Sequence, residues 1–251
     1  MWLSLGVMRR KIQIGLMGLG CWLGAVLPGR IRAQQRLELQ LLARAGSQLL
    51  NTEDSCSNAA GETFAVRTFR YYLSHIQLAG ADGQYYEAGK ETAWLVDLRD
   101  SSSQLLILTA HGPVQSIRFL LGVDSLVNVT GVHTGALDPA RGMFWTWNSG
   151  YIMARLEGRS PQSAAPGRNF TYHIGGYRTG QQTARWITLD VTGTTRNRIV
   201  LAADILQWFG GSTGVTIAGH PVCHEPGPLA IAIADNYSRM FSVVKEGEQQ
   251  P

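Results

Sequence analysis

The sequence predicts an all-β protein: a single β-sandwich, immunoglobulin-like or related, that ends in a short helix. Runs rich in β-branched and aromatic residues recur along the chain, and apolar and polar residues alternate within them, as in strands with one buried face. Clusters of Gly, Pro, Asp and Ser separate these runs at a spacing typical of a sandwich. The 251 residues, 45% of them hydrophobic and 16% charged, are sufficient for one sizeable core.

The first 33 residues have the pattern of a secretory signal peptide. Arg9-Arg10-Lys11 precedes an apolar run over residues 12–27, and Ile31-Arg32-Ala33 precedes Gln34. Because the apolar run is short and interrupted by glycine, we expect cleavage after Ala33 and no stable membrane span. Lipidation at Cys21 is the alternative. Either way, one domain over residues 34–251 would be exported, to the periplasm or another extracytoplasmic location.

The charge balance changes when the signal is removed. Residues 1–33 hold five basic residues and no acidic one, so 17 of the 22 basic residues remain against 18 acidic ones. The mature chain then has a net charge of −1. This nearly neutral balance gives no indication of a nucleic-acid-binding protein.

The first half of the domain contains five strand candidates. The first begins where Leu37, Leu39 and Leu41 occupy alternate positions. The others cover residues 63–79, 92–98, 104–109 and 114–122. Residues 121–141 are expected to form a long loop without structure of its own, and such loops often carry function.

Three further strands and two helical segments are expected after residue 160. The strands cover residues 169–174, 184–191 and 197–202. Residues 205–209 suggest a short helical turn. Pro228 can open a final helix, in which Leu229, Ile233, Tyr237 and Met240 recur at helical spacing. That stripe is expected to pack on the core.

The densest aromatic stretch, residues 142–158, changes character at its middle. Trp145 and Trp147 are two residues apart, so an extended backbone would place both on one face. Residues 151–157 alternate as a strand does, and Asn148-Ser149-Gly150 permits a bulge or tight bend. The alternative interpretation is that both tryptophans are sandwich core.

This stretch also carries a resemblance to a known family. Gly142-Met-Phe-Trp-Thr-Trp-Asn-Ser-Gly-Tyr resembles the signature of the MbnP-like family, periplasmic copper-binding proteins encoded beside methanobactin operons or beside di-haem partners of the MbnH type. Further blocks agree in order over roughly residues 36–243; they begin at Phe69, Trp94, Ile117, Thr134, Phe170 and Ile233. Several blocks in the right order are more specific than one short motif. The resemblance implies bound copper and an MbnH-type di-haem protein as partner.

Histidine and methionine supply the candidate copper ligands. His173 stands in Tyr-His-Ile-Gly-Gly, which resembles a His-bearing strand of the family and is therefore the first candidate. The others are His133 on the loop before the Trp pair, Met143, and His75, which stands where the resemblance implies Asn. Cu(II) binds imidazole nitrogen, Cu(I) accepts thioether sulfur, and an indole face attracts a cation. The sequence contains neither zinc-finger spacing nor acidic clusters suited to calcium.

The resemblance implies a modified tryptophan as well. In the family a di-haem partner oxidises a tryptophan to kynurenine, so Trp145 or Trp147 is the implied substrate, with Trp145 preferred. Opening the indole replaces a donor-only N–H with an aniline amine and a ketone. Related sites can carry a His two residues after the oxidised Trp, whereas Trp147 and Ser149 occupy those positions here. Kynurenine is therefore not expected to be a copper ligand.

Two cysteines, Cys56 and Cys223, remain after the signal is removed. In an oxidising compartment they are expected to form one disulfide. The alternative is that Cys223 and His224 act as soft metal ligands, with His220 nearby.

The resemblance, supported by the supply of His and Met, implies an exported, non-catalytic protein that acquires, stores or hands over copper. The main alternative is an extracytoplasmic recognition module in which Trp145, Trp147 and Tyr151 stack on a carbohydrate or a protein partner. A purely structural surface domain is a third interpretation. A hydrolase is not favoured, because Gly-x-Ser-x-Gly occurs only as Gly210-Gly-Ser-Thr-Gly214, in a stretch that is expected to be a flexible loop and not the strand-to-helix turn that a nucleophile elbow requires.

Overall fold

In a computed structural model, the chain divides into Met1–Ile31 and a compact unit, Arg32–Pro251. The structure describes residues 1–2, 34–148, 150–195, 197–211 and 214–245. Apart from residues 1–2, the expected signal peptide and its Cys21 lipidation alternative lie outside the described residues. Within the described ranges, none of the helices has the length and apolarity needed to span a bilayer.

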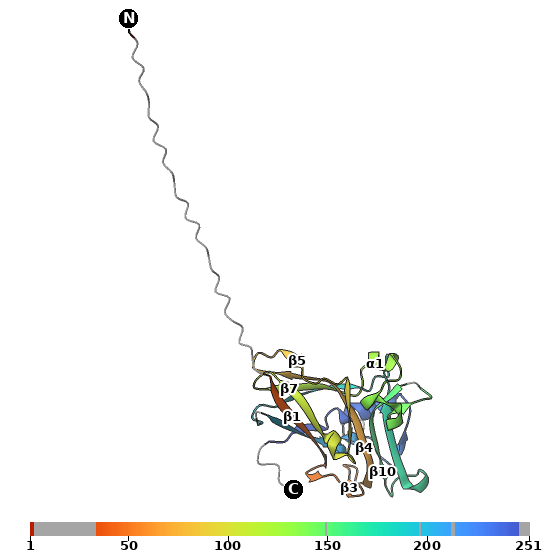
Figure 1. Ribbon diagram of the computed structural model, residues 1–251. Helices are drawn as coiled ribbons and strands as arrows, with labels where there is room; N and C mark the ends of the chain where they lie inside the picture. Colours follow the sequence, from red (N-terminus) through yellow and green to blue (C-terminus); the bar gives the residue numbers. More distant parts are fainter. Residues whose placement is uncertain (3–33, 149, 196, 212–213, 246–251) are drawn as a thin grey trace. The chain divides into compact units, whose positions relative to one another are not determined.

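Two β-sheets build the unit and confirm the predicted sandwich (Figure 1). The smaller sheet contains β1 (Gln35–Ala45), β2 (Gln48–Leu49), β7 (Leu105–Ala110), β13 (Arg198–Asp204) and β15 (Phe241–Val243). The larger sheet runs in the order β12 (Arg185–Asp190), β8 (Ser116–Leu121), β4 (Thr63–Ala79), β10 (Gly150–Arg159), β11 (Asn169–Gly175) and β14 (Val222–Cys223). Four further strands pair with members of this sheet: β3 (Ser55–Ser57), β5 (Tyr85–Glu87) and β6 (Ala93–Asp97) with β4, and β9 (Phe144–Trp145) with β10. The strands anticipated from alternation are therefore present, whereas the shortest ones were not anticipated.

The main core lies between the two sheets and follows the sequence alternation. Leu37, Leu39 and Leu41 of β1 are buried, while the residues between them are partly exposed. Each fully buried leucine contributes about 1.5–3 kcal/mol relative to an exposed one. On β11, alternation directs Phe170, Tyr172 and Ile174 into this core. The intervening side chains of β11 therefore point to the opposite face of the sheet.

Both predicted helical segments are present. The turn at residues 205–209 is the short 3-10 helix η5 (Ile205–Trp208), which Asp204 caps by accepting a hydrogen bond from the N–H of Leu206. The final helix is α2 (Pro228–Tyr237), with proline in its first turn. It ends before Met240, which is buried but lies outside the helix, because the chain re-enters the smaller sheet as β15. Two other 3-10 turns are η1 (Ser101–Gln104) and η4 (Pro166–Arg168).

The long loop at residues 121–141 has structure of its own, contrary to the expectation. It contains α1 (Ser125–Val129), η2 (Gly135–Leu137) and η3 (Pro139–Arg141). Side chains from this segment and from β9 form a second apolar cluster over the start of β10; its buried members are Tyr72, Ala93, Val123, Leu137, Met143, Trp145, Tyr151, Ile152 and Met153. Residues 151–154 are therefore buried on both faces of the sheet, whereas their alternation alone predicted one.

The predicted disulfide between Cys56 and Cys223 is not formed, and both residues are buried free thiols. Cys56 lies on β3 and Cys223 on β14, and three strands of the larger sheet, β4, β10 and β11, separate them. Four strand spacings amount to about 19 Å along the sheet. A disulfide requires Cα atoms within about 7 Å. Distance along the sheet is thus the physical reason for the correction.

Candidate functional site

The His173 side chain lies on the face of β11 that points away from the main core. Its neighbours Tyr172 and Ile174 are fully buried on the core side. β14 runs parallel to β11 and pairs Cys223 with Tyr172. His224 therefore follows directly beside His173. The two imidazole rings stack with centroids 4.4 Å apart and planes at 25°.

His224 is suited to metal binding by its environment. Partial burial lowers the pKa of His224, and the neighbouring His173 and Arg155 lower it further against the opposing effect of Glu157. The neutral imidazole, which is the metal-binding form, is thereby favoured. The adjacent Cys223 is different, because its side chain lies in the main core. Burial raises the pKa of the Cys223 thiol to about 11, which does not favour the thiolate that a metal requires.

Glu157 on β10 adds a carboxylate to the histidine pair. Its Oε1 lies 2.6 Å from Nε2 of His173 and 2.7 Å from Nη2 of Arg155. Burial alone would raise the pKa of Glu157, but the hydrogen bonds from His173 and Arg155 outweigh it and hold the pKa at about 2. A negatively charged carboxylate therefore stands against His173 at neutral pH.

The tryptophan pair lies beside this face of the sheet, and its two members differ. β9 ends at Trp145, whose ring lies so close to Gly175 of β11 that a Cβ there would be 2.7 Å from it. Trp145 is therefore buried, with 6% exposed. Trp147 lies in the following turn with 64% exposed, and the two indole centroids are 5.3 Å apart.

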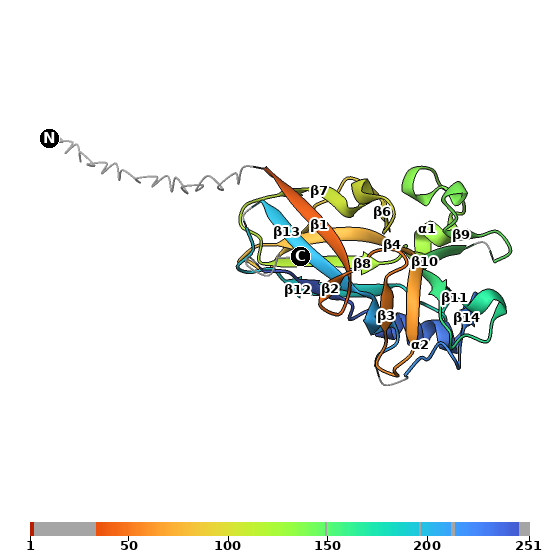
Figure 2. The same ribbon diagram turned by 90° about the horizontal axis from the view of Figure 1, so that it is seen from below.

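The exposed tryptophan and His224 share a hollow of about 410 Å³. Its remaining lining comes from β14, from the turn after it with Pro226, and from the first turn of α2, which begins at Pro228. Figure 2 shows β9, β11, β14 and α2 at the same end of the unit. The hollow thus gives a solvent-borne ion or a partner protein access to His224 and Trp147 together.

The other sequence-predicted ligands lie elsewhere. His133 places Nε2 3.0 Å from Thr130 Oγ1 and 3.2 Å from the Val127 carbonyl, at the end of α1. His75, at φ 48°, lies 3.4 Å from Asp124 through Nε2. Met143 is fully buried in the second apolar cluster. The predicted set of four therefore does not converge, and His224 takes the place beside His173.

Two of the sequence interpretations change with these positions. Trp145 was preferred from the sequence as the modified residue, but a partner protein reaches a tryptophan from the surface, and it is Trp147 that is exposed. The aromatic recognition platform also loses support, because Tyr151 and Trp145 are buried and only Trp147 is exposed. His224 was weighed only as a companion of Cys223, and Glu157 was not singled out at all. For Glu157, the sequence signal was its outward position in an alternating strand.

The donor chemistry of this face suits copper. The two stacked imidazoles offer nitrogen donors that Cu(II) binds strongly, and the flanking carboxylate adds a negative charge beside them. Within the described part of the chain, no three His, Cys, Asp or Glu side chains gather closely enough to form a complete metal cage. A metal held by this pair would therefore need a further ligand from solvent, from the Trp147 side or from a partner.

The family model described as MbnP matches residues 34–225, which include His173, Glu157, Trp147 and His224. Among solved structures, the chain is similar to MbnP from Methylosinus trichosporium, with a TM-score of 0.52. The sequences are 14% identical, and the match covers 73% of this chain and 83% of that chain. At this identity the structural likeness concerns the fold alone. The curated proteins compared include no match.

Proposed function

The chain belongs to the MbnP family, and from this premise we propose that it is an exported, non-catalytic protein that binds copper at His173 and His224. The family is associated with copper-related systems. Copper is the cargo in this proposal: the protein acquires it, stores it or hands it over.

The stacked imidazole pair is the observation that carries the proposal. His173 and His224 are 51 positions apart in sequence, yet their rings lie 4.4 Å apart on an accessible face of the sheet. The lowered pKa of His224 favours its neutral imidazole, the form that can offer a nitrogen to a metal.

A copper titration followed by electron paramagnetic resonance tests the proposal. The purified mature chain should bind one Cu(II) with nitrogen hyperfine structure from two imidazoles. His224→Ala should reduce the nitrogen count by one, and a matched His133→Ala variant should leave it unchanged. Absence of a saturable nitrogen-coordinated signal in the wild-type protein would remove the proposed function.

Within the same proposal, Trp147 is the substrate of a di-haem MbnH-type partner. Oxidation breaks the indole C2–C3 bond and adds two oxygen atoms, which an oxidant activated at the partner's haems supplies. Hydrolysis then releases the former C2 as formate and leaves kynurenine. The exposure of Trp147 supports this choice. Its ring centroid lies 5.3 Å from that of Trp145, so the radical cation formed when one electron is removed can be shared between the two indoles.

Peptide mass spectrometry after co-expression with a di-haem partner tests the choice of residue. Trp147 should be converted while Trp145 is not. Trp186 provides the matched control, because it is 52% exposed but lies on β12, away from the histidine pair. Equal conversion of Trp186 would indicate unspecific oxidation, and conversion of Trp145 alone would refute the assignment.

A further inference from the structure

A row of charged side chains crosses the larger sheet and ends at the candidate site. Strand register places Asp97 of β6 opposite Arg70 of β4, Arg70 opposite Arg155 of β10, and Arg155 opposite His173 of β11. His224, after β14, completes the row. Four neighbouring strands, and the residue that directly follows a fifth, thus contribute one side chain each to a single line across the outer face.

Two arginines stand directly opposite each other in the middle of this row. Like charges in that arrangement destabilise a sheet. Asp97 compensates Arg70 at 2.7 Å and Glu157 compensates Arg155 at 2.7 Å. Within the described residues, the Nε atoms of both arginines are buried without a hydrogen-bond partner. An arrangement with these costs is not one that stability alone favours.

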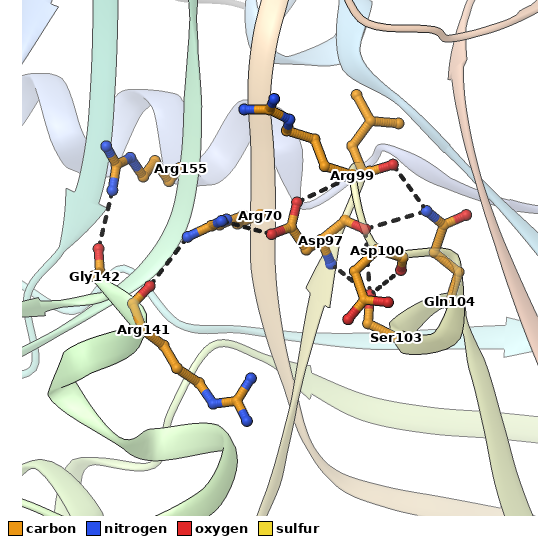
Figure 3. Close-up of polar contacts among 10 residues, drawn as sticks. Arg70, Asp97, Arg99, Asp100, Ser103, Gln104, Arg141, Gly142 and Arg155 are labelled. Carbon is orange, nitrogen blue, oxygen red and sulfur yellow. Dashed lines mark hydrogen bonds and ion pairs between the residues drawn. The ribbon is translucent and has the colours of Figure 1, made fainter.

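The arginine pair holds the turn that leads to the tryptophans. Arg70 donates through Nη1 to the carbonyl of Arg141 at 3.0 Å, and Arg155 donates through Nη1 to the carbonyl of Gly142 at 3.0 Å. Figure 3 shows the two guanidinium groups reaching these successive carbonyls, with Asp97 on the far side of Arg70. Gly142 has φ 72° and ends η3, only three residues before Trp145. The arginines therefore tie the Trp segment, residues 142–148, to the sheet.

Glu157 connects the same arginine to the histidine pair. An ionised carboxylate can only accept hydrogen bonds. Its 2.6 Å contact with Nε2 of His173 therefore requires that Nε2 carries the proton. The unprotonated nitrogen of a neutral His173 is then Nδ1. A carboxylate behind a histidine is the usual arrangement at metal sites, because it fixes the tautomer and orientation of the ring.

We propose that Gly142, Arg155, Glu157 and His173 form a positioning chain, in which Glu157 presents Nδ1 of His173 to copper and Arg155 ties that geometry to the Trp segment. Arg155 and Glu157 are positioning residues in this chain and not copper ligands. The inference rests on the proposed copper function for its metal, but the state of His173 and the anchoring of the Trp segment are properties of the metal-free protein.

The first test uses metal-free, nitrogen-15-labelled mature protein. Long-range proton–nitrogen correlation should show His173 protonated at Nε2 and unprotonated at Nδ1. Glu157→Ala should distribute the proton over both ring nitrogens, while Glu157→Gln, whose amide oxygen still accepts from Nε2, should preserve the wild-type tautomer. Glu38→Ala, which removes a carboxylate from an exposed ion pair with Arg36, is the control. A wild-type His173 protonated at Nδ1 alone overturns the proposal.

The second test addresses the Trp segment and the copper affinity. Arg155→Met should accelerate hydrogen–deuterium exchange in the peptide over residues 139–148 and leave the exchange of β1 and β13 unchanged; Arg36→Met is its control. Glu157→Ala should weaken Cu(II) binding about 10- to 100-fold without changing the nitrogen count in the paramagnetic resonance spectrum.

The outcomes separate this inference from the proposed function. If the wild-type protein binds no copper, the proposed function fails, and the tautomer and exchange experiments still decide the positioning chain. If it binds copper but Glu157→Ala binds as tightly as Glu38→Ala, or if the loss of Glu157 removes an oxygen ligand, the positioning role is refuted. Unchanged exchange in Arg155→Met refutes the anchoring of the Trp segment.

Discussion

Glu62 is a buried carboxylate that is distant in sequence from the candidate site but holds the segment that leads to His224. Its Oε2 accepts from Asn58 Nδ2 at 2.6 Å and from the N–H of Ile217 at 2.7 Å, and its Oε1 accepts from the N–H of Ala218 at 2.8 Å. The segment it holds leads directly into β14 and His224. Replacement of Glu62 by Gln should therefore loosen a connection between residues 155 positions apart.

The expected size of the effect follows from the contacts. A glutamine retains one acceptor oxygen, and its amide NH₂ turns a donor toward at least one N–H group that Glu62 now accepts from. Hydrogen bonds to a charged group contribute about 1.5–3 kcal/mol, and a buried donor left without a partner costs a similar amount. We expect Glu62→Gln to lower the free energy of unfolding by about 2–3 kcal/mol at pH 7.

The effect should depend on pH in a defined direction. Burial raises the pKa of Glu62, but the hydrogen bonds from Ala218, Asn58 and Ile217 outweigh it, so the net pKa is lowered. A carboxylate with a lowered folded-state pKa stabilises the protein above its unfolded pKa of about 4.3 and loses this contribution as the pH falls through the folded-state value. The wild-type protein and Glu62→Gln should thus converge in acid.

Urea unfolding followed by tryptophan fluorescence, between pH 7 and pH 3, measures both quantities. Glu38→Gln is the matched control, because the exposed pair of Glu38 with Arg36 should contribute under about 1 kcal/mol. The reasoning is refuted if Glu62→Gln is as stable as Glu38→Gln at neutral pH, or if the difference from wild type widens as the pH falls below 4.3.

The remaining predictions concern the site and its surroundings. His173→Ala should weaken copper binding by about 100-fold or more, since even indirect partners of a metal site contribute 10- to 100-fold. His111→Ala should not, because His111 packs against Tyr86 and is not part of the stacked pair; equal affinities in a competition titration would contradict this. Gly175→Ala should destabilise the fold by about 1–3 kcal/mol through overpacking against the Trp145 ring and the Tyr151 carbonyl, while Gly210→Ala, with 3.7 Å to its nearest neighbour, should be neutral in the same urea assay. The two buried cysteines should react with a thiol reagent only after unfolding, and a non-reducing peptide map that joins them would disprove the free-thiol state.

Local pattern was sufficient for much of the fold. Alternation over residues 169–174 predicted a strand, and it also determined that His173 points away from the core, because Phe170, Tyr172 and Ile174 have to be buried. The same reasoning located β4, β8 and β13, and helical spacing after Pro228 located α2. These features depend on residues within one or two turns of each other. The family resemblance, carried by blocks in order, was likewise readable without coordinates.

Tertiary structure alone decided which outward side chains meet. His224 stands beside His173 because β14 pairs in parallel with β11, and no local pattern specifies the partner of a two-residue strand. The burial of Trp145 depends on its close contact with Gly175, which is made across 30 residues of chain. The separation of Cys56 and Cys223 by three intervening strands also depends on which strands pair in the larger sheet. Strand alternation determines the face on which a side chain lies, but the pairing and register of distant strands follow from how the whole core packs.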